Sequence, residues 1–155
     1  MNLTGIHHVS ILVSDMERAV AWYRDALGLQ EVIRPSNFVT PVRWFALGEQ
    51  QIHLIPNDVP DAVSPRHFAL HVDDCDAARE TLRTRGVEIK ETVPIAGARR
   101  FFIADPDGNN LELIQWLRRW DEWSEQELGV PENGDRQMAT EASRKGGAVR
   151  ELPQH

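Results

Sequence analysis

The sequence repeats itself at an interval of 59 residues, and this repeat limits the possible folds more than any other feature of the chain. One stretch starts at His8 and runs HVSILVSDMERAVAWYRDALGLQEV; a second starts at His67 and runs HFALHVDDCDAARETLRTRGVEIKE. In each, an aspartate follows the histidine by seven residues. Further on, IHLI around His53 aligns with LELI around Glu112 at the same offset. Three polar landmarks that share one offset predict two copies of one supersecondary unit.

The first copy, over about residues 4–56, has the pattern of a β-α-β-β-β unit. Residues 6–13 alternate between apolar and polar side chains, which predicts a strand. Ser14 or Asp15 is placed to cap the helix that follows, and Gly28 is placed to end it. Shorter strands are predicted near 30–34, 42–47 and 50–56.

The second copy, over about residues 66–116, repeats this plan after a linker at 57–65 that contains Pro60 and Pro65. Its predicted elements are a strand over 66–72, a helix over about 75–85 capped by Asp73 or Asp74 and ended by Gly86, and strands near 87–92, 98–104 and 109–116. The last hairpin turns on Asp-Pro-Asp-Gly-Asn, a strong turn sequence. Together the copies predict an α+β domain over residues 1–116, in which two tandem βαβββ modules form a curved mixed sheet around a metal cleft.

Residues 117–155 lie outside the repeat. Three tryptophans and Leu117 are spaced to form one amphipathic helix that ends near Gly129, and the segment from Pro131 onward is polar. The sequence therefore predicts a C-terminal helix followed by a polar tail.

Four side chains at matched positions of the two copies indicate a metal site. Strand alternation puts His8 and His53 on one face of the first copy, and His67 and Glu112 on the equivalent face of the second. If the two sheets curl towards each other about a pseudo-two-fold axis, the four side chains meet in one cavity. Imidazole and carboxylate together suit one divalent nickel, zinc, iron, manganese or cobalt ion. His53 is alternatively a group beside the metal that carries a proton.

Other side chains on the predicted cavity faces are candidates for substrate binding. His71 lies on the same strand face as His67, and it either touches the substrate or lies at the rim. Trp44 and Phe102 either line an apolar pocket or pack in the core. Arg100 either meets an anionic group of the substrate or lies on a solvated edge.

Composition and charge exclude several classes of function. The net charge of −7 and the pI of about 5.3 argue against nucleic-acid binding, which normally needs a basic face. The single cysteine leaves no internal disulfide. No secretory signal pattern opens the chain, and its apolar runs are too short to span a membrane. We expect a cytoplasmic protein that acts on a small molecule, without a nucleic-acid or membrane partner.

The segments IHHVSILVSDMERAVAWYRDALGL, IHLIP, RHFALHVDD and FFIADPDGNNLELI resemble the vicinal oxygen chelate superfamily, which includes glyoxalase I, bleomycin-resistance proteins and extradiol dioxygenases. The resemblance implies the paired βαβββ fold and a homodimer. The superfamily's metal ligands fall on His8, His67 and Glu112. The fourth position falls on His53, where bacterial glyoxalase I has Glu and methylmalonyl-CoA epimerase has Gln.

The resemblance implies a divalent-metal-dependent lyase or isomerase of the glyoxalase I type. Its small substrate would carry vicinal oxygens and react by proton transfer through a metal-bound enediolate, with Glu112 or His53 moving the proton. An Fe(II) extradiol-type dioxygenase and a non-catalytic binding protein of the bleomycin-resistance type are the alternatives. The sequence leaves open whether a site lies within one chain or is shared between two.

Overall fold

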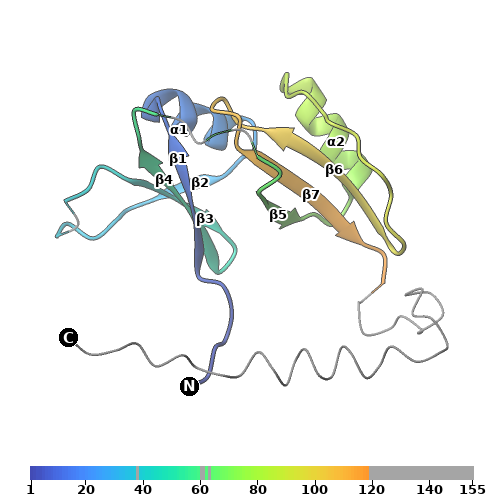
Figure 1. Cartoon of the computed structure of the whole chain (residues 1–155), viewed down its shortest axis with the longest axis horizontal. Helices are drawn as coiled ribbons and strands as arrows, with labels where there is room; N and C mark the ends of the chain where they lie inside the picture. Colours follow the sequence, from blue (N-terminus) through green and yellow to red (C-terminus); the bar gives the residue numbers. More distant parts are fainter. Residues whose placement is uncertain (38, 60–61, 63, 119–155) are drawn as a thin grey trace, which may run out of the picture. The chain divides into compact units, whose positions relative to one another are not determined.

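The computed structural model describes residues 1–37, 39–59, 62 and 64–118 (Figure 1). The chain divides after Leu117, and the helices and strands of the described residues lie in the unit Met1–Leu117. Their order is β1 (His8–Val13), α1 (Met16–Asp25), β2 (Gln30–Val32), β3 (Arg43–Leu47), β4 (Gln50–Pro56), β5 (His67–His71), α2 (Cys75–Thr84), β6 (Ala98–Ala104) and β7 (Asn110–Trp116). The helix predicted after Trp116 falls almost entirely outside the described residues, and the polar tail predicted from Pro131 lies wholly outside them.

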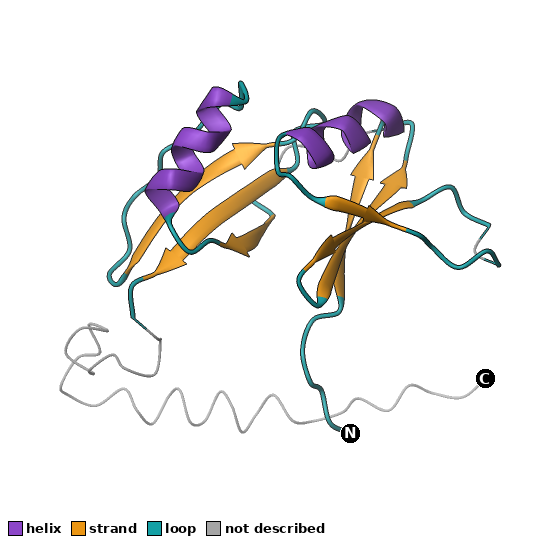
Figure 2. Ribbon diagram, turned by 180° about the vertical axis from the view of Figure 1, so that it is seen from behind, coloured by secondary structure: helices purple, strands orange, loops and turns teal. Residues whose placement is uncertain are grey.

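Each copy of the repeat forms one mixed sheet. The first sheet has the order β1-β4-β3-β2, in which β1 is parallel to β4 and the other pairs are antiparallel. The second has the order β5-β7-β6, in which β5 is parallel to β7 and β6 is antiparallel to it. The predicted α+β class with paired βαβββ-type units is confirmed, and its strands are distributed over two sheets (Figure 2).

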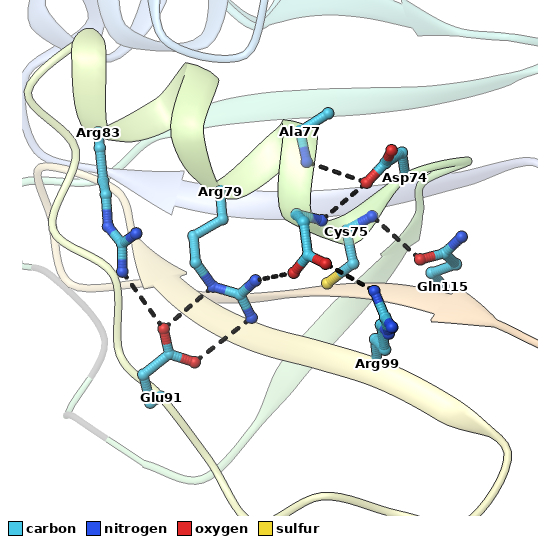
Figure 3. Close-up of polar contacts among 9 residues, drawn as sticks. Asp74, Cys75, Ala77, Arg79, Arg83, Glu91, Arg99 and Gln115 are labelled. Atoms are coloured by element: carbon cyan, nitrogen blue, oxygen red, sulfur yellow. Dashed lines mark hydrogen bonds and ion pairs between the residues drawn. The ribbon is translucent and has the colours of Figure 1, made fainter.

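The predicted strand near 87–92 is wrong. Here the chain makes a single bridge, in which Lys90 and Phe102 exchange two backbone hydrogen bonds of 2.8 and 2.9 Å. The carboxylate of the next residue, Glu91, is bound by Arg79 on α2, with 3.0 Å between Oε1 and Nε (Figure 3). Before the bridge, the Val87 amide donates to the Leu82 carbonyl of α2 at 2.9 Å and is not available to β6. After it, Pro94 has no amide hydrogen to donate to a ladder.

Both helices begin at an aspartate N-cap. The Asp15 carboxylate accepts a hydrogen bond of 3.0 Å from the backbone amide of Arg18. The Asp74 carboxylate accepts two of 2.9 Å, from the amides of Asp76 and Ala77 (Figure 3). Each such cap contributes about 0.5–2 kcal/mol of stability. In each copy the second of the two candidate residues is therefore the cap.

A glycine in the left-handed region follows each helix. Gly28 has φ of 72° and Gly86 has φ of 77°, a conformation that is strained for residues with a β carbon. The predicted helix ends are confirmed, and the chain can turn back from each helix towards its sheet. Within the described part of the chain, no helix is long and apolar enough to cross a membrane.

Each helix covers one side of its own sheet (Figure 2). The core lies between each helix and the sheet that it covers. α1 buries Ala19, Val20 and Tyr23, and α2 buries Cys75 and Leu82. The fully buried sheet residues are Val13, Phe45, Ile52, Leu54, Phe101, Ile103 and Leu111. Full burial of one such side chain stabilises the fold by about 1.5–3 kcal/mol. Because strand side chains alternate, the opposite side of each sheet carries the candidate site.

The turn between β6 and β7 joins the second copy to the first. The side-chain amide of Asn109 donates to the backbone carbonyl of Leu12 at 3.0 Å. The guanidinium of Arg18 binds Asp107 at 2.9 Å, and the Ser14 hydroxyl donates to the same carboxylate. Ser14, a candidate cap in the sequence, therefore serves in the contact between the copies.

Candidate metal site

Three aromatic rings stack across the face of the first sheet that points away from α1. Trp44 on β3 lies directly opposite His53 on β4, and β1 runs on the other side of β4. The rings of Trp44 and His53 are 4.5 Å apart with 7° between their planes. The rings of His53 and His8 are 4.1 Å apart with 14° between their planes. The strand order thus places His53 between the other two rings.

The first histidine pair is adjacent but is not set for a shared ion. Nitrogen lone pairs lie in the plane of an imidazole ring, and the planes of His8 and His53 are nearly parallel. Their lone pairs therefore run side by side, and a common metal would require at least one ring to rotate. The structure brings His8 and His53 together as the sequence predicts, in a stacked arrangement that the sequence does not reveal.

Hydrogen bonds occupy one nitrogen of each ring in this pair. His53 Nε2 lies 2.8 Å from Gln51 Oε1, and His8 Nδ1 lies 2.9 Å from His7 Nδ1. Partial burial lowers the pKa of His53, and the neighbouring charges of His8 and His7 lower it further. A lowered pKa favours the neutral imidazole, which is the form that binds a metal or accepts a proton.

The second pair, His67 and Glu112, has the spacing of two metal ligands. His67 Nε2 lies 3.3 Å from Glu112 Oε2. Two atoms bound to one metal at about 2.1 Å are about 3.0–3.4 Å apart. The other ring nitrogen of His67, Nδ1, lies 2.9 Å from the Pro65 carbonyl, which can only accept a hydrogen bond. In the neutral ring the proton therefore sits on Nδ1, and Nε2 keeps the lone pair.

Glu112 is buried, and charged and aromatic side chains surround its carboxylate. Its side chain is only 9% exposed. Arg100 on β6 donates from Nη1 to Glu112 Oε1 at 2.9 Å. Phe102 lies directly opposite Glu112 in the β6–β7 register and meets the His67 ring edge-on, with 5.0 Å between centroids. The carboxylate thus has one oxygen on Arg100 and the other towards His67.

The two pairs do not form one cluster in the described part of the chain. Over residues 1–37, 39–59, 62 and 64–118, no three His, Cys, Asp or Glu side chains lie close enough together to hold a metal ion. The candidate donors therefore form two half-sets, His8 with His53 and His67 with Glu112. The donor types fit a divalent metal, but the expected meeting of all four in one cavity is not seen within these residues.

The remaining predicted residues lie close to the two pairs. Trp44 and Phe102 each contact a candidate histidine, His53 and His67 respectively. Arg100 faces Glu112. His71 is exposed at the end of β5, where it pairs with Ile114, the residue that also lies opposite Arg100.

Three hydrogen-bond partners of the site were missed by sequence reasoning. They are His7, which contacts His8, Gln51, which contacts His53, and the Pro65 carbonyl, which contacts His67. Gln51 is two residues before His53 on one strand, so strand alternation could have identified it. A backbone carbonyl leaves no such signal in a sequence.

A cavity of about 390 Å³ is lined by His67 of the second pair, and Glu112 is not among its lining residues. Strands β1 and β5 stand at the edges of their sheets and contribute lining residues from both, among them Ser10, Leu12, His67 and Phe68. His67 thus borders a space large enough to receive a small molecule.

A family model described as the Glyoxalase/Bleomycin resistance protein/Dioxygenase superfamily matches residues 5–113. The chain belongs to this superfamily. The match spans both copies of the repeat and includes all four candidate metal ligands. The vicinal oxygen chelate resemblance and the paired fold predicted from the sequence are thereby confirmed.

The individual proteins that this chain resembles carry different names. The chain is 32% identical to the protein YwkD of Bacillus subtilis, over 74% of this chain and 99% of that one. It is 29% identical to the lactoylglutathione lyase of Salmonella typhimurium, over 70% of this chain and 90% of that one. A solved structure of a glyoxalase family protein from Bacillus anthracis has a TM-score of 0.70 and 26% identity, over 75% of this chain and 98% of that one. Superfamily membership leaves the specific activity to be derived from the site.

Proposed function

We propose that the protein is a divalent-metal-dependent enzyme of the glyoxalase type, a lyase or isomerase that acts on a small molecule with two adjacent oxygens. The metal, one of nickel, zinc, iron, manganese or cobalt, is held by His8, His53, His67 and Glu112. The observation that carries the proposal is the 3.3 Å spacing of His67 Nε2 and Glu112 Oε2. The contact between the Pro65 carbonyl and the other ring nitrogen fits this role, because a histidine that binds a metal usually donates its other N–H to a carbonyl or carboxylate.

Each metal site is built from two copies of the chain. One copy contributes His8 and His53, and the second copy contributes His67 and Glu112. This proposal is supported by the separation of the two half-sets among the described residues. Two-fold symmetry then generates two equal sites, because the same pair of surfaces meets twice in a symmetric dimer.

The residues of the two half-sets have distinct tasks in this proposal. When bound, the metal supplies Lewis-acid polarisation of the substrate oxygens. His53 or Glu112 would leave the metal to accept the proton removed from carbon, and would then return it to the adjacent carbon. The indole of Trp44, stacked on His53, and the ring of Phe102, edge-on to His67, keep apolar surface beside the reacting groups. Both rings help to exclude water there, and His71 lies at the rim.

The metal content of the full-length chain tests the proposal first. Wild type is compared with two double variants that each remove one half-set, His8→Ala/His53→Ala and His67→Ala/Glu112→Ala. Mass spectrometry of the metal and light scattering of the protein give metal per chain and oligomeric state. We expect about one metal per chain in a wild-type dimer and none in either double variant.

Mixing the two double variants tests the shared site. After subunit exchange about half of the dimers contain one chain of each kind, and each such dimer has one intact site. We expect the mixture to bind about a quarter of the wild-type amount of metal. No recovery on mixing would place the site within one chain. A wild-type protein that binds none of the five metals would contradict the enzyme and favour a binding protein, and iron with oxygen uptake on a catechol would favour a dioxygenase.

A further inference from the structure

We propose that Arg100 is a positioning residue that keeps Glu112 a one-oxygen ligand of the metal, and so leaves a coordination position open for the substrate. The inference rests on the proposed function, because it concerns the same metal. It assigns Arg100 a role other than the contact with an anionic substrate group that the sequence suggests.

The two carboxylate oxygens of Glu112 face different partners. Oε1 accepts a hydrogen bond of 2.9 Å from Arg100 Nη1. Oε2 lies 3.3 Å from His67 Nε2, the nitrogen that carries the lone pair when the ring is neutral. A charge-assisted hydrogen bond to guanidinium is directional and among the stronger ones in proteins. Oε1 is therefore already bound to Arg100 in the metal-free chain. Only Oε2 faces His67 Nε2, where the metal would bind.

Arg100 is itself fixed, so it does not leave Glu112 readily. Its Nη2 donates to the Val93 carbonyl at 3.1 Å, and its guanidinium lies 5.8 Å from the centre of the Phe102 ring. The side chain is 19% exposed. Its Nε is buried with no hydrogen-bond partner in the part of the chain that the structure describes. Three of its contacts would have to break before the guanidinium could reach out to a substrate.

The number of oxygens that a carboxylate gives to a metal decides how many positions remain for a substrate. Carboxylates bind metals with one oxygen or with both. A substrate that chelates through two oxygens needs two open positions. A second bond from Glu112 would take one of them. By holding Oε1, Arg100 prevents that second bond without touching the substrate.

The adjacent residue Arg99 provides a matched control. It stands next to Arg100 on β6, but on the opposite face, where it binds Asp76 on α2 at 2.6 Å (Figure 3). Its side chain is 55% exposed. Arg99→Met thus removes the same charge from the same strand without contact with Glu112.

The experiment compares wild type, Arg100→Met, Arg100→Lys and Arg99→Met, each loaded with Co²⁺ as full-length protein. Visible absorption reports the coordination number of Co²⁺, since the bands weaken as ligands are added. Acetohydroxamate, which chelates through two oxygens, is titrated into each sample as the substrate mimic. Circular dichroism checks the fold, and Arg100→Gln replaces the methionine variant if that variant does not fold.

We expect Arg100→Met to show weaker cobalt bands and to bind acetohydroxamate at least about 10-fold less tightly than wild type. Arg100→Lys should restore both, because an ammonium can still donate to Oε1. Arg99→Met should match wild type. Equal cobalt bands and equal acetohydroxamate affinity in wild type and Arg100→Met would overturn this inference and leave the proposed function standing. A wild type without cobalt bands would instead contradict the proposed function, and this inference with it.

Discussion

The hydroxyl of Tyr23 on α1 donates a hydrogen bond of 3.0 Å to the carboxylate of Asp105, which belongs to the other copy of the repeat. Asp105 opens the Asp-Pro-Asp-Gly-Asn turn between β6 and β7 and also accepts from the backbone amides of Asp107 and Asn109. The carboxylate therefore closes its own turn and holds the turn against α1. A segment that the sequence marks only as a turn thus also joins the two copies.

Removal of the Tyr23 hydroxyl should destabilise the whole unit. Tyr23→Phe leaves the buried Asp105 carboxylate without one of its donors, which costs about 1–3 kcal/mol. Urea unfolding followed by fluorescence gives the free energy of unfolding. Thr81→Val is the matched control, because it removes an exposed helix hydroxyl that donates to the Ala77 carbonyl. Equal effects of the two substitutions would show that the contact between the copies adds nothing.

The same hydroxyl should make stability depend on pH in the alkaline range. Burial raises the pKa of Tyr23, and the charge and hydrogen bond of Asp105 raise it further. Its contribution is therefore fully present below the ordinary tyrosine pKa of about 10 and is lost as pH rises above it, because the unfolded chain ionises first. We expect the stability difference between wild type and Tyr23→Phe to shrink by up to about 1.4 kcal/mol per pH unit above that value. Urea midpoints from pH 8 to 11 measure it, and parallel curves would contradict the expectation.

The local parts of the fold could be predicted because their causes are local. Asp74 caps its helix through amides two and three residues away, so residue type and spacing suffice to identify it. The failed strand near 87–92 depends on a contact across space. Val87 and Ile89 alternate as strand residues do, but the backbone amide of Val87 donates to the Leu82 carbonyl of α2. Such competition between a ladder and a helix does not appear in the pattern of one segment.

The sequence could predict which face of its strand each candidate residue occupies, but not which residues it contacts. Alternation puts Glu112 on the side of the sheet away from α2, and Gln115, on the opposite face of β7, accepts from the Cys75 amide of α2. Its contact with Arg100 depends on the β6–β7 register, which sets Phe102 and not Arg100 directly opposite Glu112. Register follows from the length and shape of the hairpin turn. The position of His8 relative to His67 depends on how whole modules pack, which no repeat offset specifies.

The single cysteine of the chain should be unreactive in the folded protein. Cys75 is fully buried at the start of α2, and its amide donates to Gln115 Oε1 at 3.1 Å (Figure 3). Burial raises the pKa of the thiol, and the opposing charge of Arg79 does not reverse this. Since only the thiolate reacts, a disulfide reagent should modify Cys75 slowly at neutral pH and only through unfolding. One thiol per chain should react at once in urea, and rapid reaction of the native protein would contradict its buried placement.

Loss of Glu112 should weaken metal binding more than loss of His53. Glu112 supplies the negative charge of the half-set that already has ligand spacing, whereas His53 belongs to a stacked pair whose rings must rotate. We expect Glu112→Gln to reduce Zn²⁺ affinity by at least about 100-fold and His53→Gln by about 10-fold. Competition with a coloured chelator measures both. Glu91→Gln, an exposed carboxylate bound by Arg79, is the control and should leave the affinity unchanged. If His53→Gln reduced Zn²⁺ affinity as much as Glu112→Gln, the expectation would be wrong. His8 and His53 would then contribute as much to metal binding as His67 and Glu112, after a rearrangement of their stacked rings. If Glu112→Gln kept the full affinity, the carboxylate would serve only its ion pair with Arg100, and the proposed metal site would be wrong.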